Sequence, residues 1–483
     1  MTTVFPPANY FIASSRLRPG LDGGYTVATM RRALQYAEFG GVQPVLLAFD
    51  FWPEYDAIKQ EFIAMGLATE ATELRGLYQD VRDTPSIIRD VARANGVFTA
   101  APAVAVTSTT DLDSTGRAWR TLAKDAAGTI VHTDFLDSTG ALLFRLPYIS
   151  GRPDWWRSEL LIDVFDGGEL VGQLRGFGEL YQAWVRSLVA AVDGPSIVVV
   201  EARQVGEMLI GDADREYSIV HTVHNAHTAA PHNWDSEMDE TWTGWFEVID
   251  QFDAVIWLTE QQRKDAERRF APHPGAVVIP HPAEPIASFP DPYQRDPNLA
   301  IMVARLAEQK RIAHAIQAWP IVVAAHPDAR LEIYGEGVQR TMLEQLAAEL
   351  GVTDSVHFMG YDPNASAAME RAGLLIVSSN YEGHSLVVLE AFSRGCPIVA
   401  YDISYGPAET IVDGANGLIV PAGDIPALGE AVASLLGDAD RIAAYSNGAY
   451  QWAREHGIEM SMTRSAELFE SVLGRIPAGG FRA

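Results

Sequence analysis

Apolar residues in the second half of the chain gather in short continuous runs, separated by longer stretches in which apolar positions recur at helical spacing. In chain order the runs are LAIMVARL, LEIYGEG, VHFMG, GLLIVSS, PIVAYDI and GLIVP. Strands that are covered on both faces lose the alternation of polar and apolar residues. The pattern therefore predicts a parallel sheet with helical crossovers, and we expect one Rossmann-like lobe over residues 290–455.

The first half of the chain contains similar runs, which predict a second lobe of the same kind. They are YFIASS, PVLLAF, SIVVVEA, YSIVHTVH, AVIWLT and AVVIPH. We assign this lobe to residues 1–99 and 181–285, and the proline-rich stretch 280–297 to a linker that fixes direction without joining either core. Residues 456–483 are expected to form a helix that packs back on the first lobe. The predicted fold class is α/β, with two lobes facing a cleft.

Between residues 100 and 180 the pattern changes from helical crossovers to hairpins. TIVHTDFL and ALLFRLPYI flank the turn DSTG, while ELLIDVFD and ELVGQLRG flank a turn at Gly167 and Gly168. Runs separated by such short turns are typical of antiparallel pairs. We expect an inserted antiparallel sheet with exposed edges, which serves self-association or acceptor binding. A flap that only packs on its own lobe is the alternative.

Composition and charge limit the function further. A chain of 483 residues is too long for one ordinary core, and 48% hydrophobic with 20% charged residues is typical of a folded globular protein. We find no signal peptide and no apolar run of about 18 residues, so we expect a cytoplasmic protein, with a peripheral position at the inner face of the membrane as an option. A net charge of -27 argues against nucleic acid as a partner. The single cysteine, Cys396, lies in the apolar run CPIVAY and is expected to be a buried core thiol.

Two cations follow the first strand of the predicted second lobe. Arg305 comes at the end of LAIMVARL, and Lys310 stands five residues later, near the start of the next helix. Cations at the carboxyl edge of a parallel sheet, beside a helix N-terminus, can hold a diphosphate leaving group. Taken alone, the pair would be better explained as two solvated basic residues.

Two carboxylates strengthen this interpretation. Glu382 and Glu390 bound the segment EGHSLVVLE, which directly follows the apolar run GLLIVSS. If all eight steps were helical, the carboxylates would be about 12 Å apart, so they would serve two ends of a long ligand rather than one atom. Gly383 allows the backbone to come close to that ligand.

The run IVHTVHNAHT ends another predicted strand and brings three histidines together, His221, His224 and His227. The spacing His-x2-His also occurs in zinc sites, but no third ligand is indicated nearby, and we predict no metal site. A single histidine at such a place is more often structural than functional, so the run alone does not decide its role.

Together, R-x4-K, YGEG, VHFMGY, EGHSLVVLEAFSRGCPIVAYD and YGPAETIVDGANGLIVPAGD, over about residues 300–430, resemble the donor lobe of glycosyltransferase family 4. The resemblance implies the GT-B fold, in which two Rossmann-like lobes face a cleft. It implies that Arg305 and Lys310 neutralise the nucleotide diphosphate. By the same resemblance, Glu390 accepts hydrogen bonds from the ribose hydroxyls and Glu382 lies beside the transferred sugar.

The resemblance implies further donor contacts. Gly23 and Gly24 would form a glycine loop that meets the donor phosphate and sugar, and either His224 or His227 would face the sugar. In the other lobe, the residues implied to adjoin the donor are Gly383, His384, Ser385 and Leu386. The segment from His357 to Tyr361 would frame the base. His384 stands where the family usually has an aromatic residue, and this departure leaves the donor sugar open.

The hairpin insertion and the run SYGPAETIVDG narrow the resemblance to the poly(glycerol-phosphate) alpha-glucosyltransferases of wall teichoic acid and the accessory-Sec protein O-GlcNAc transferases. This implies a retaining hexosyltransferase that moves sugar from UDP-glucose or UDP-N-acetylglucosamine to a teichoic-acid-type polymer or to protein Ser/Thr. It also implies that no metal or other cofactor is required, and that the insertion forms a homo-oligomer. Retention by front-face attack or by a covalent intermediate stays open. The alternatives are a non-catalytic partner subunit of a glycosyltransferase complex, or another GT-B enzyme such as a phosphorylase or epimerase.

Overall fold

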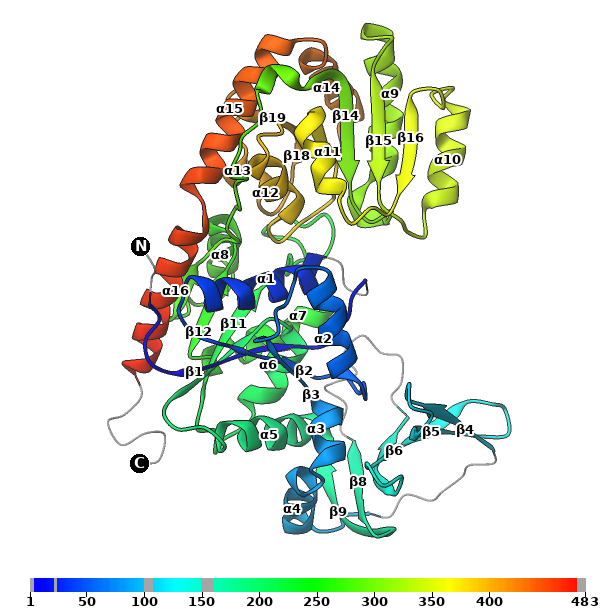
Figure 1. Cartoon of the computed structure of the whole chain (residues 1–483), viewed down its shortest axis with the longest axis vertical. Helices are drawn as coiled ribbons and strands as arrows, with labels where there is room; N and C mark the ends of the chain where they lie inside the picture. The colour runs from blue at the N-terminus through cyan, green and yellow to red at the C-terminus, as the bar shows by residue number, and fades with distance from the viewer. Residues whose placement is uncertain (1–3, 21–23, 100–106, 149–159, 476–483) are drawn as a thin grey trace.

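The computed structural model describes residues 4–20, 24–99, 107–148 and 160–475. Figure 1 shows two α/β lobes arranged along the long axis, and an antiparallel sheet that extends from the far end of the N-terminal lobe. Within these described segments no helix is long and apolar enough to cross a membrane.

The N-terminal lobe is built on a seven-stranded parallel sheet with the order β13-β12-β11-β10-β1-β2-β3. The strands are β1 (Asn9–Ser14), β2 (Val45–Ala48), β3 (Glu73–Gly76), β10 (Ser196–Val200), β11 (Ser218–Val223), β12 (Ala254–Trp257) and β13 (Ala276–Val278). Six of them coincide with the predicted apolar runs. β3 has no such run, because it is an edge strand in which only two of four residues are buried.

Helices cover both faces of this sheet. Tyr10 and Ile12 of β1 point into one hydrophobic core, and Phe11 and Ala13 point into the other, as alternate residues of a strand must. The helices are α1 (Gly24–Glu38), α2 (Tyr55–Ala64), α3 (Leu77–Asp83), α4 (Ser86–Asn95), α5 (Gly176–Val189), α6 (Arg203–Ile210), α7 (Glu240–Glu247) and α8 (Glu260–Glu267).

The C-terminal lobe repeats the design with six parallel strands in the order β16-β15-β14-β17-β18-β19. They are β14 (Asp296–Val303), β15 (Arg330–Tyr334), β16 (Val356–Gly360), β17 (Ala372–Val377), β18 (Ile398–Asp402) and β19 (Gly417–Pro421), and all six match predicted runs. Their helices are α9 (Ile312–Ala325), α10 (Arg340–Glu349), α11 (Ala365–Arg371), α12 (Leu386–Ser393), α13 (Pro407–Thr410), α14 (Ile425–Leu435) and α15 (Ala439–Glu455).

Two details of this lobe bear on the sequence analysis. β14 begins at Asp296, so the end of the proline-rich stretch belongs to a strand rather than to a linker. Cys396 is fully buried, and burial raises the pKa of its thiol to about 11. The prediction of a core thiol is confirmed.

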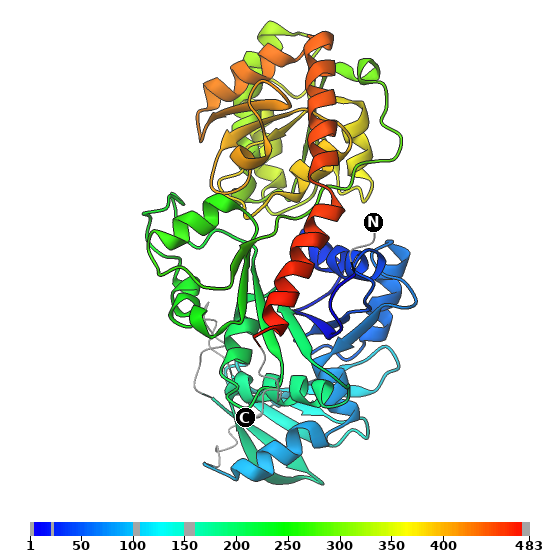
Figure 2. The same cartoon turned by 90° about the vertical axis from the view of Figure 1, so that its left-hand side faces the viewer.

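The last described helix returns to the N-terminal lobe. α16 (Ile458–Leu473) follows α15 after two residues, and Figure 2 shows the two helices running from one lobe to the other. Phe469 of α16 lies 5.1 Å from the ring of Phe5, 5.2 Å from Tyr10 and 5.9 Å from Tyr36. The N-terminal core is therefore completed by the C-terminal segment.

The insertion is a six-stranded antiparallel sheet in which the strands pair in chain order. They are β4 (Thr107–Leu112), β5 (Ala118–Lys124), β6 (Ile130–Leu136), β7 (Leu142–Pro147), β8 (Leu161–Asp166) and β9 (Glu169–Arg175). The antiparallel sheet and its hairpins β6–β7 and β8–β9 were predicted, whereas β4–β5 was not. The reason is that β4 is polar and almost wholly exposed.

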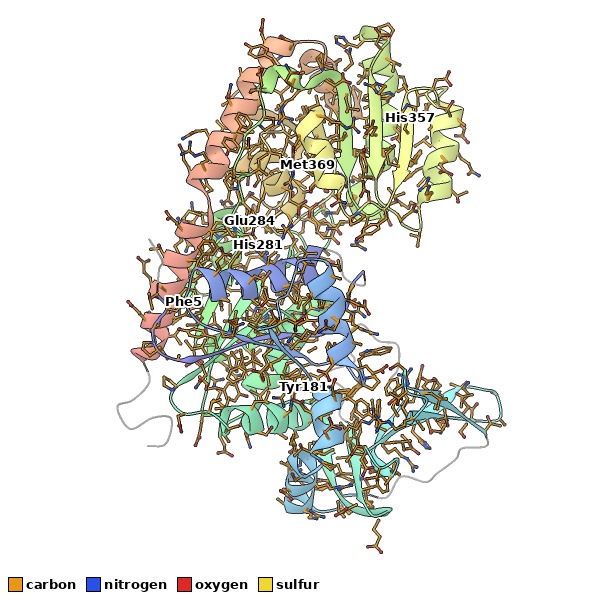
Figure 3. All side chains as sticks on the ribbon, in the orientation of Figure 1. Phe5, Tyr181, His281, Glu284, His357 and Met369 are labelled. Carbon is orange, nitrogen blue, oxygen red and sulfur yellow. The ribbon has the colours of Figure 1, made fainter. Side chains whose placement is uncertain are left out.

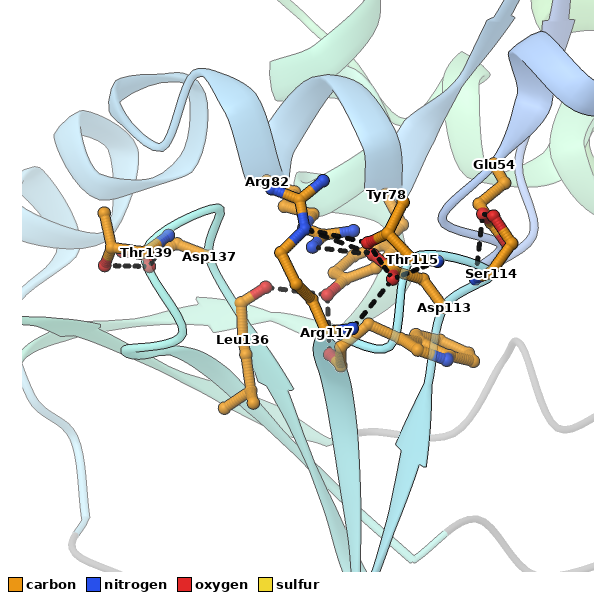
Figure 4. A network of polar contacts seen from close by, with 11 residues as sticks. Glu54, Tyr78, Arg82, Asp113, Ser114, Thr115, Arg117, Leu136, Asp137 and Thr139 are labelled. Atoms are coloured by element: carbon orange, nitrogen blue, oxygen red, sulfur yellow. Dashed lines mark hydrogen bonds and ion pairs between the residues drawn. The ribbon is translucent and has the colours of Figure 1, made fainter.

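The sheet is fixed to the lobe through polar contacts of α3, which Figure 4 shows. The hydroxyl of Tyr78 on α3 lies 2.6 Å from the backbone carbonyl oxygens of both Trp119 and Leu136. Arg82 of α3 forms a buried ion pair of 3.2 Å with Asp113 in the β4–β5 turn. The hydrophobic core under the insertion is continuous with that of the N-terminal lobe.

The two edges of the inserted sheet differ. The backbone of Gln173 on β9 accepts a hydrogen bond from the Asn95 side chain and donates one to the carbonyl of Gly96, each of 3.0 Å. The β9 edge is thus covered by the end of α4, and the expectation of open edges was wrong for this strand. β4 forms the other edge and is exposed.

Candidate functional site

Two helix N-termini meet between the lobes. α1 begins at Gly24 and α12 begins at Leu386, and a Cβ added to Gly24 would lie only 3.4 Å from Cδ1 of Leu386. Free amide groups and the helix dipole make such ends favourable for anions. The convergence therefore suits a phosphate group. Gly23, which was predicted beside Gly24, lies outside the described residues.

Lys310 and Glu382 meet in the C-terminal lobe beside this point. Lys310 ends a short 3-10 turn after β14, and Glu382 lies in the loop between β17 and α12. Nζ of Lys310 is 2.6 Å from Oε1 of Glu382, and the Ser379 hydroxyl donates to the same oxygen at 2.7 Å. Two residues that the sequence singled out separately thus form one buried pair.

Glu390 faces the N-terminal lobe from α12. Its Oε1 lies 3.1 Å from Nη1 of Arg31 on α1, and both side chains are partly exposed. Glu382 precedes the helix rather than standing in it, so the two glutamates do contact different cations on different lobes. The sequence analysis did not find Arg31.

The loop between Glu382 and α12 touches the other lobe. A Cβ at Gly383 would come within 1.7 Å of the backbone carbonyl oxygen of His224, so only glycine fits there. Burial lowers the pKa of His384 to about 4, and its ring lies 5.9 Å from that of His281. Ser385 is buried, and its carbonyl accepts amide hydrogen bonds from the first turn of α12.

A buried polar unit lies below His224 at the carboxyl edge of the N-terminal sheet. Glu201 directly follows β10, and its carboxylate contacts Nε2 of His224 and lies 3.3 Å from Nε of Arg32. Burial alone would raise the pKa of Glu201, but Arg32 and His224 hold it below its usual value. The sequence analysis missed Glu201, although its place directly after SIVVV was a signal.

The other two histidines of the run point into the protein. His221 is buried beside Trp245 and Phe252, and burial holds its pKa well below the usual value. His227 is fully buried, its ring is stacked 6.1 Å from Tyr405, and burial lowers its pKa to about 4. Neither ring has a hydrogen-bond partner among the described residues. Of the three, His224 is the one with a carboxylate partner at the meeting of the lobes.

Arg305 and Tyr361 are more exposed than the rest of the set. Arg305 follows β14. Burial is the main reason that the pKa of Tyr381 is raised, and the positive charge of Arg305 offsets part of that rise. Tyr361 is 68% exposed and follows β16, two strands away from β14. Tyr361 and the exposed His357 thus belong to the edge strand β16 and the loop after it, two strands away from the strand that precedes Arg305 and Lys310.

A crevice of about 770 Å³ opens near Arg31, on the hinge side of the cleft. It is lined by α1, by the segment around Glu284 between the lobes and by the junction of α15 and α16. Figure 3 labels Glu284 and His281 on that segment. In the part of the chain that the structure describes, no group of three or more His, Cys, Asp or Glu side chains could hold a metal ion.

Comparison with known proteins extends these observations. Residues 286–452 match the family model described as Glycosyl transferases group 1. The chain is 35% identical over 229 residues to an exopolysaccharide phosphotransferase of Streptomyces coelicolor. This alignment covers 46% of this chain and 24% of that protein. It is 29% identical over 291 residues to the poly(glycerol-phosphate) alpha-glucosyltransferase of Bacillus subtilis, which covers 58% of this chain and 41% of that protein. The chain thus spans less than half of the length of either relative.

Solved structures establish the fold. A TarM mutant of S. aureus, in complex with fondaparinux, alpha-GlcNAc-glycerol and UDP, aligns with a TM-score of 0.77 at 16% identity over 96% of this chain and 100% of that chain. The chain has the GT-B fold. The pneumococcal O-GlcNAc transferase GtfA, in complex with UDP and GlcNAc, aligns with a TM-score of 0.67 at 17% identity over 96% of this chain and 99% of that chain. The predicted GT-B fold with an inserted antiparallel sheet is confirmed.

Proposed function

We propose that this protein is a retaining glycosyltransferase of family 4 that transfers glucose or N-acetylglucosamine from a UDP-sugar. One observation carries the proposal: the Lys310–Glu382 pair and Glu390 lie beside the meeting point of two helix N-termini. A nucleotide diphosphate needs such a cluster of cations and amides. The match of residues 286–452 to a glycosyltransferase family model and the UDP bound in both structural neighbours support this assignment.

The proposed chemistry depends on charge stabilisation. As the bond between the anomeric carbon and the diphosphate breaks, negative charge grows on the leaving oxygens. Lys310, Arg305 and the first amides of α12 stabilise that charge without a metal ion. Glu382 lies beside the positively charged sugar, and Glu390 accepts hydrogen bonds from the ribose. Between the two candidate histidines we assign the contact with the sugar to His224, because His227 is fully buried among aromatic rings.

The acceptor is proposed to be a wall polymer of the teichoic acid type, or Ser/Thr of a protein. The relative from Bacillus subtilis is named for a poly(glycerol-phosphate) acceptor, and the pneumococcal neighbour is an O-GlcNAc transferase. A net charge of -27 opposes a polyanion at long range, so a polymer would have to be held by local cations such as Arg305. The exposed β4 edge is the part of the insertion that is open for a homo-oligomer or for the acceptor.

The second candidate is a non-catalytic partner subunit that keeps the fold without turnover. The paired Lys310 and Glu382, and Glu390 on the facing helix, favour the enzyme, because a subunit that only binds a partner has no use for this cluster. A phosphorylase or an epimerase on the same fold would differ in its products.

An acceptor assay tests the proposal. The purified chain is incubated with UDP-glucose or UDP-N-acetylglucosamine and with poly(glycerol phosphate), poly(ribitol phosphate) or a Ser-rich peptide, with and without EDTA, and the product linkage is determined by NMR. We expect an alpha linkage from one donor and undiminished turnover in EDTA. Loss of turnover in EDTA that Mg²⁺ restores would refute metal independence. Absence of transfer and of donor hydrolysis would favour the non-catalytic subunit.

A further inference from the structure

A buried carboxylate at the floor of the cleft has no place in the function proposed above. The side chain of Glu201 has no solvent exposure, whereas that of His224 is 13% exposed. One carboxylate oxygen lies 3.3 Å from Nε of Arg32 and the other contacts Nε2 of His224. Burial of an unpaired charge is costly, so Arg32, Glu201 and His224 must be treated as one unit.

Packing holds the His224 ring in place. Tyr25 meets it edge-on at 5.4 Å, and the ring of His281 stacks on it at 5.5 Å. Within the described residues no group bonds its second ring nitrogen, Nδ1. The backbone of the same residue touches Gly383, which follows Glu382. His224 therefore stands where the lobes meet, with one nitrogen held and the other open.

Arg32 determines what Glu201 can do. It neutralises the buried charge and, with His224, keeps the pKa of Glu201 below its usual value although burial opposes this. Glu201 is therefore an ionised carboxylate at neutral pH, which accepts hydrogen bonds and donates none. A neutral imidazole carries one N–H, so a partner that only accepts fixes that proton on the nitrogen it contacts.

We propose that Glu201 is a positioning residue for sugar transfer: its carboxylate holds the imidazole proton of His224 on Nε2 and leaves Nδ1 as a fixed acceptor for one hydroxyl of the donor sugar. The proposal rests on the proposed function and adds a basis for donor choice. A nitrogen that can only accept requires a hydroxyl that donates. A donor without that hydroxyl would leave Nδ1 unpaired in the closed complex and would be rejected.

Glu201→Gln is the matched test, because it keeps the shape and removes the charge. The amide offers both N–H and C=O to Nε2, so the tautomer is no longer fixed. We expect kcat for donor turnover to fall at least about tenfold and the donor KM to change much less, since an oriented contact at the reacting sugar acts mainly in the transition state. Asp212→Asn is the control. It removes another buried carboxylate of the same lobe, paired with Arg186 and away from the cleft, and should leave kcat near the wild-type value.

A double-mutant cycle and NMR separate positioning from a purely structural role. In the His224→Ala background, Glu201→Gln should cost little more, because Glu201 acts through His224. In the wild-type protein, ¹⁵N NMR of labelled histidine should show His224 as the Nε2–H tautomer, with a mixture in Glu201→Gln. This measurement on the wild type does not depend on how well the variant folds.

The outcomes distinguish the two proposals. Full activity of Glu201→Gln, independent costs in the cycle, or an Nδ1–H tautomer in the wild type would overturn the role of Glu201 and leave the glycosyltransferase intact. A wild type that turns over no UDP-sugar would refute the proposed function itself, and the tautomer would then still decide whether Glu201 holds the proton on Nε2.

Discussion

Single charged residues in the cleft pair with one another. Lys310 contacts Glu382, and Arg31 contacts Glu390 across the lobes. Under the proposed function each of these groups contacts the nucleotide-sugar, so donor binding would exchange protein partners for substrate atoms. Substitutions here should therefore change kinetics more than stability.

Lys310→Ala is expected to lower donor turnover by roughly a hundredfold, the cost of losing one pre-organised charge at a leaving group. Because the lysine side chain is 19% exposed and lies at the end of a short 3-10 turn outside the α-helices, the fold should survive. Initial rates of UDP release and thermal unfolding, measured on the same preparation, check both parts. Lys264→Ala, at an exposed lysine on α8, is the control for loss of a positive charge. A wild-type rate in Lys310→Ala would show that the lysine is only solvated.

At the residue scale, the sequence could mark residues of the cleft where the signal was local. Lys310 and Glu382 each follow a buried strand, and parallel strands bring their carboxyl ends to one edge, so their proximity could be expected. Glu201 and Arg31 act through partners that are 23 and 359 residues away in the chain. No local pattern marks such a pairing, although the position of Glu201 directly after SIVVV was a signal that the residue itself lies at the sheet edge.

At the scale of elements, the insertion is joined to its lobe by polar turns as well as by its core. Asp113 accepts hydrogen bonds from the hydroxyl and the amide of Thr115 and from the amide of Arg117, and it forms the buried ion pair with Arg82. The hydrogen bond from the Thr115 hydroxyl is the main reason that the pKa of Asp113 is lowered to about 2. Burial acts in the opposite direction, but the other hydrogen bonds and Arg82 outweigh it.

This pKa predicts how the insertion responds to acid. A carboxylate with a pKa of about 3.9 in the unfolded chain and about 2 in the fold stabilises the protein fully above the first value, and the contribution is lost as pH falls through the second. Asp113→Asn should therefore be less stable than the wild type at pH 5, and the difference should narrow between about pH 4 and pH 2. Hydrogen exchange of β4 and β5 amides, measured across that range, checks this.

Asp111→Asn provides the matched control, because Asp111 pairs with Arg120 at 2.7 Å on the surface of the same sheet. It should shift exchange much less than Asp113→Asn. Equal effects of the two substitutions, or a difference that does not narrow in acid, would show that Asp113 does not anchor the turn.

A strand could be predicted from the sequence when its burial required a run of apolar residues. Twelve of the thirteen parallel strands carry an apolar run, and β3 does not because it is a half-exposed edge. The hairpin β4–β5 was missed because β4 is an almost wholly exposed edge and β5 has only two buried residues. LDSTG at residues 112–116 recurs at 136–140, and the second copy forms the predicted turn. That repeat was the available signal for the first hairpin.

At the scale of the whole molecule, the lobes are in direct contact where the donor would bind. Gly383 meets the backbone of His224, and the Glu409 carboxylate of the C-terminal lobe accepts amide hydrogen bonds from Glu260 and Gln261 at the start of α8, at 2.8 and 2.6 Å. Direct contacts thus join the N-terminal and C-terminal lobes at the cleft. These contacts between the lobes involve single residues from distant parts of the chain. Sequence patterns therefore predicted the two lobes but not the contacts that join them.

Arg31 and Glu390 should have opposite effects on donor binding. Glu390→Ala should raise the donor KM about tenfold or more, because charged hydrogen bonds to the ribose are lost in ground and transition states alike. Arg31→Ala should lower KM by up to about fivefold, since a partly exposed ion pair worth about 1 kcal/mol no longer competes with the ribose. Initial rates over a range of donor concentrations measure both. A rise in KM for Arg31→Ala would show that Arg31 binds substrate instead.

Calorimetric titration with UDP is the most direct test that the cleft is a nucleotide-sugar site. We expect one UDP per chain to bind in EDTA, with affinity reduced by Lys310→Ala and by Glu390→Ala and unchanged by Lys264→Ala. If the wild-type protein does not bind UDP, or binds it equally well without Lys310 and Glu390, the cluster between the lobes is not a donor site.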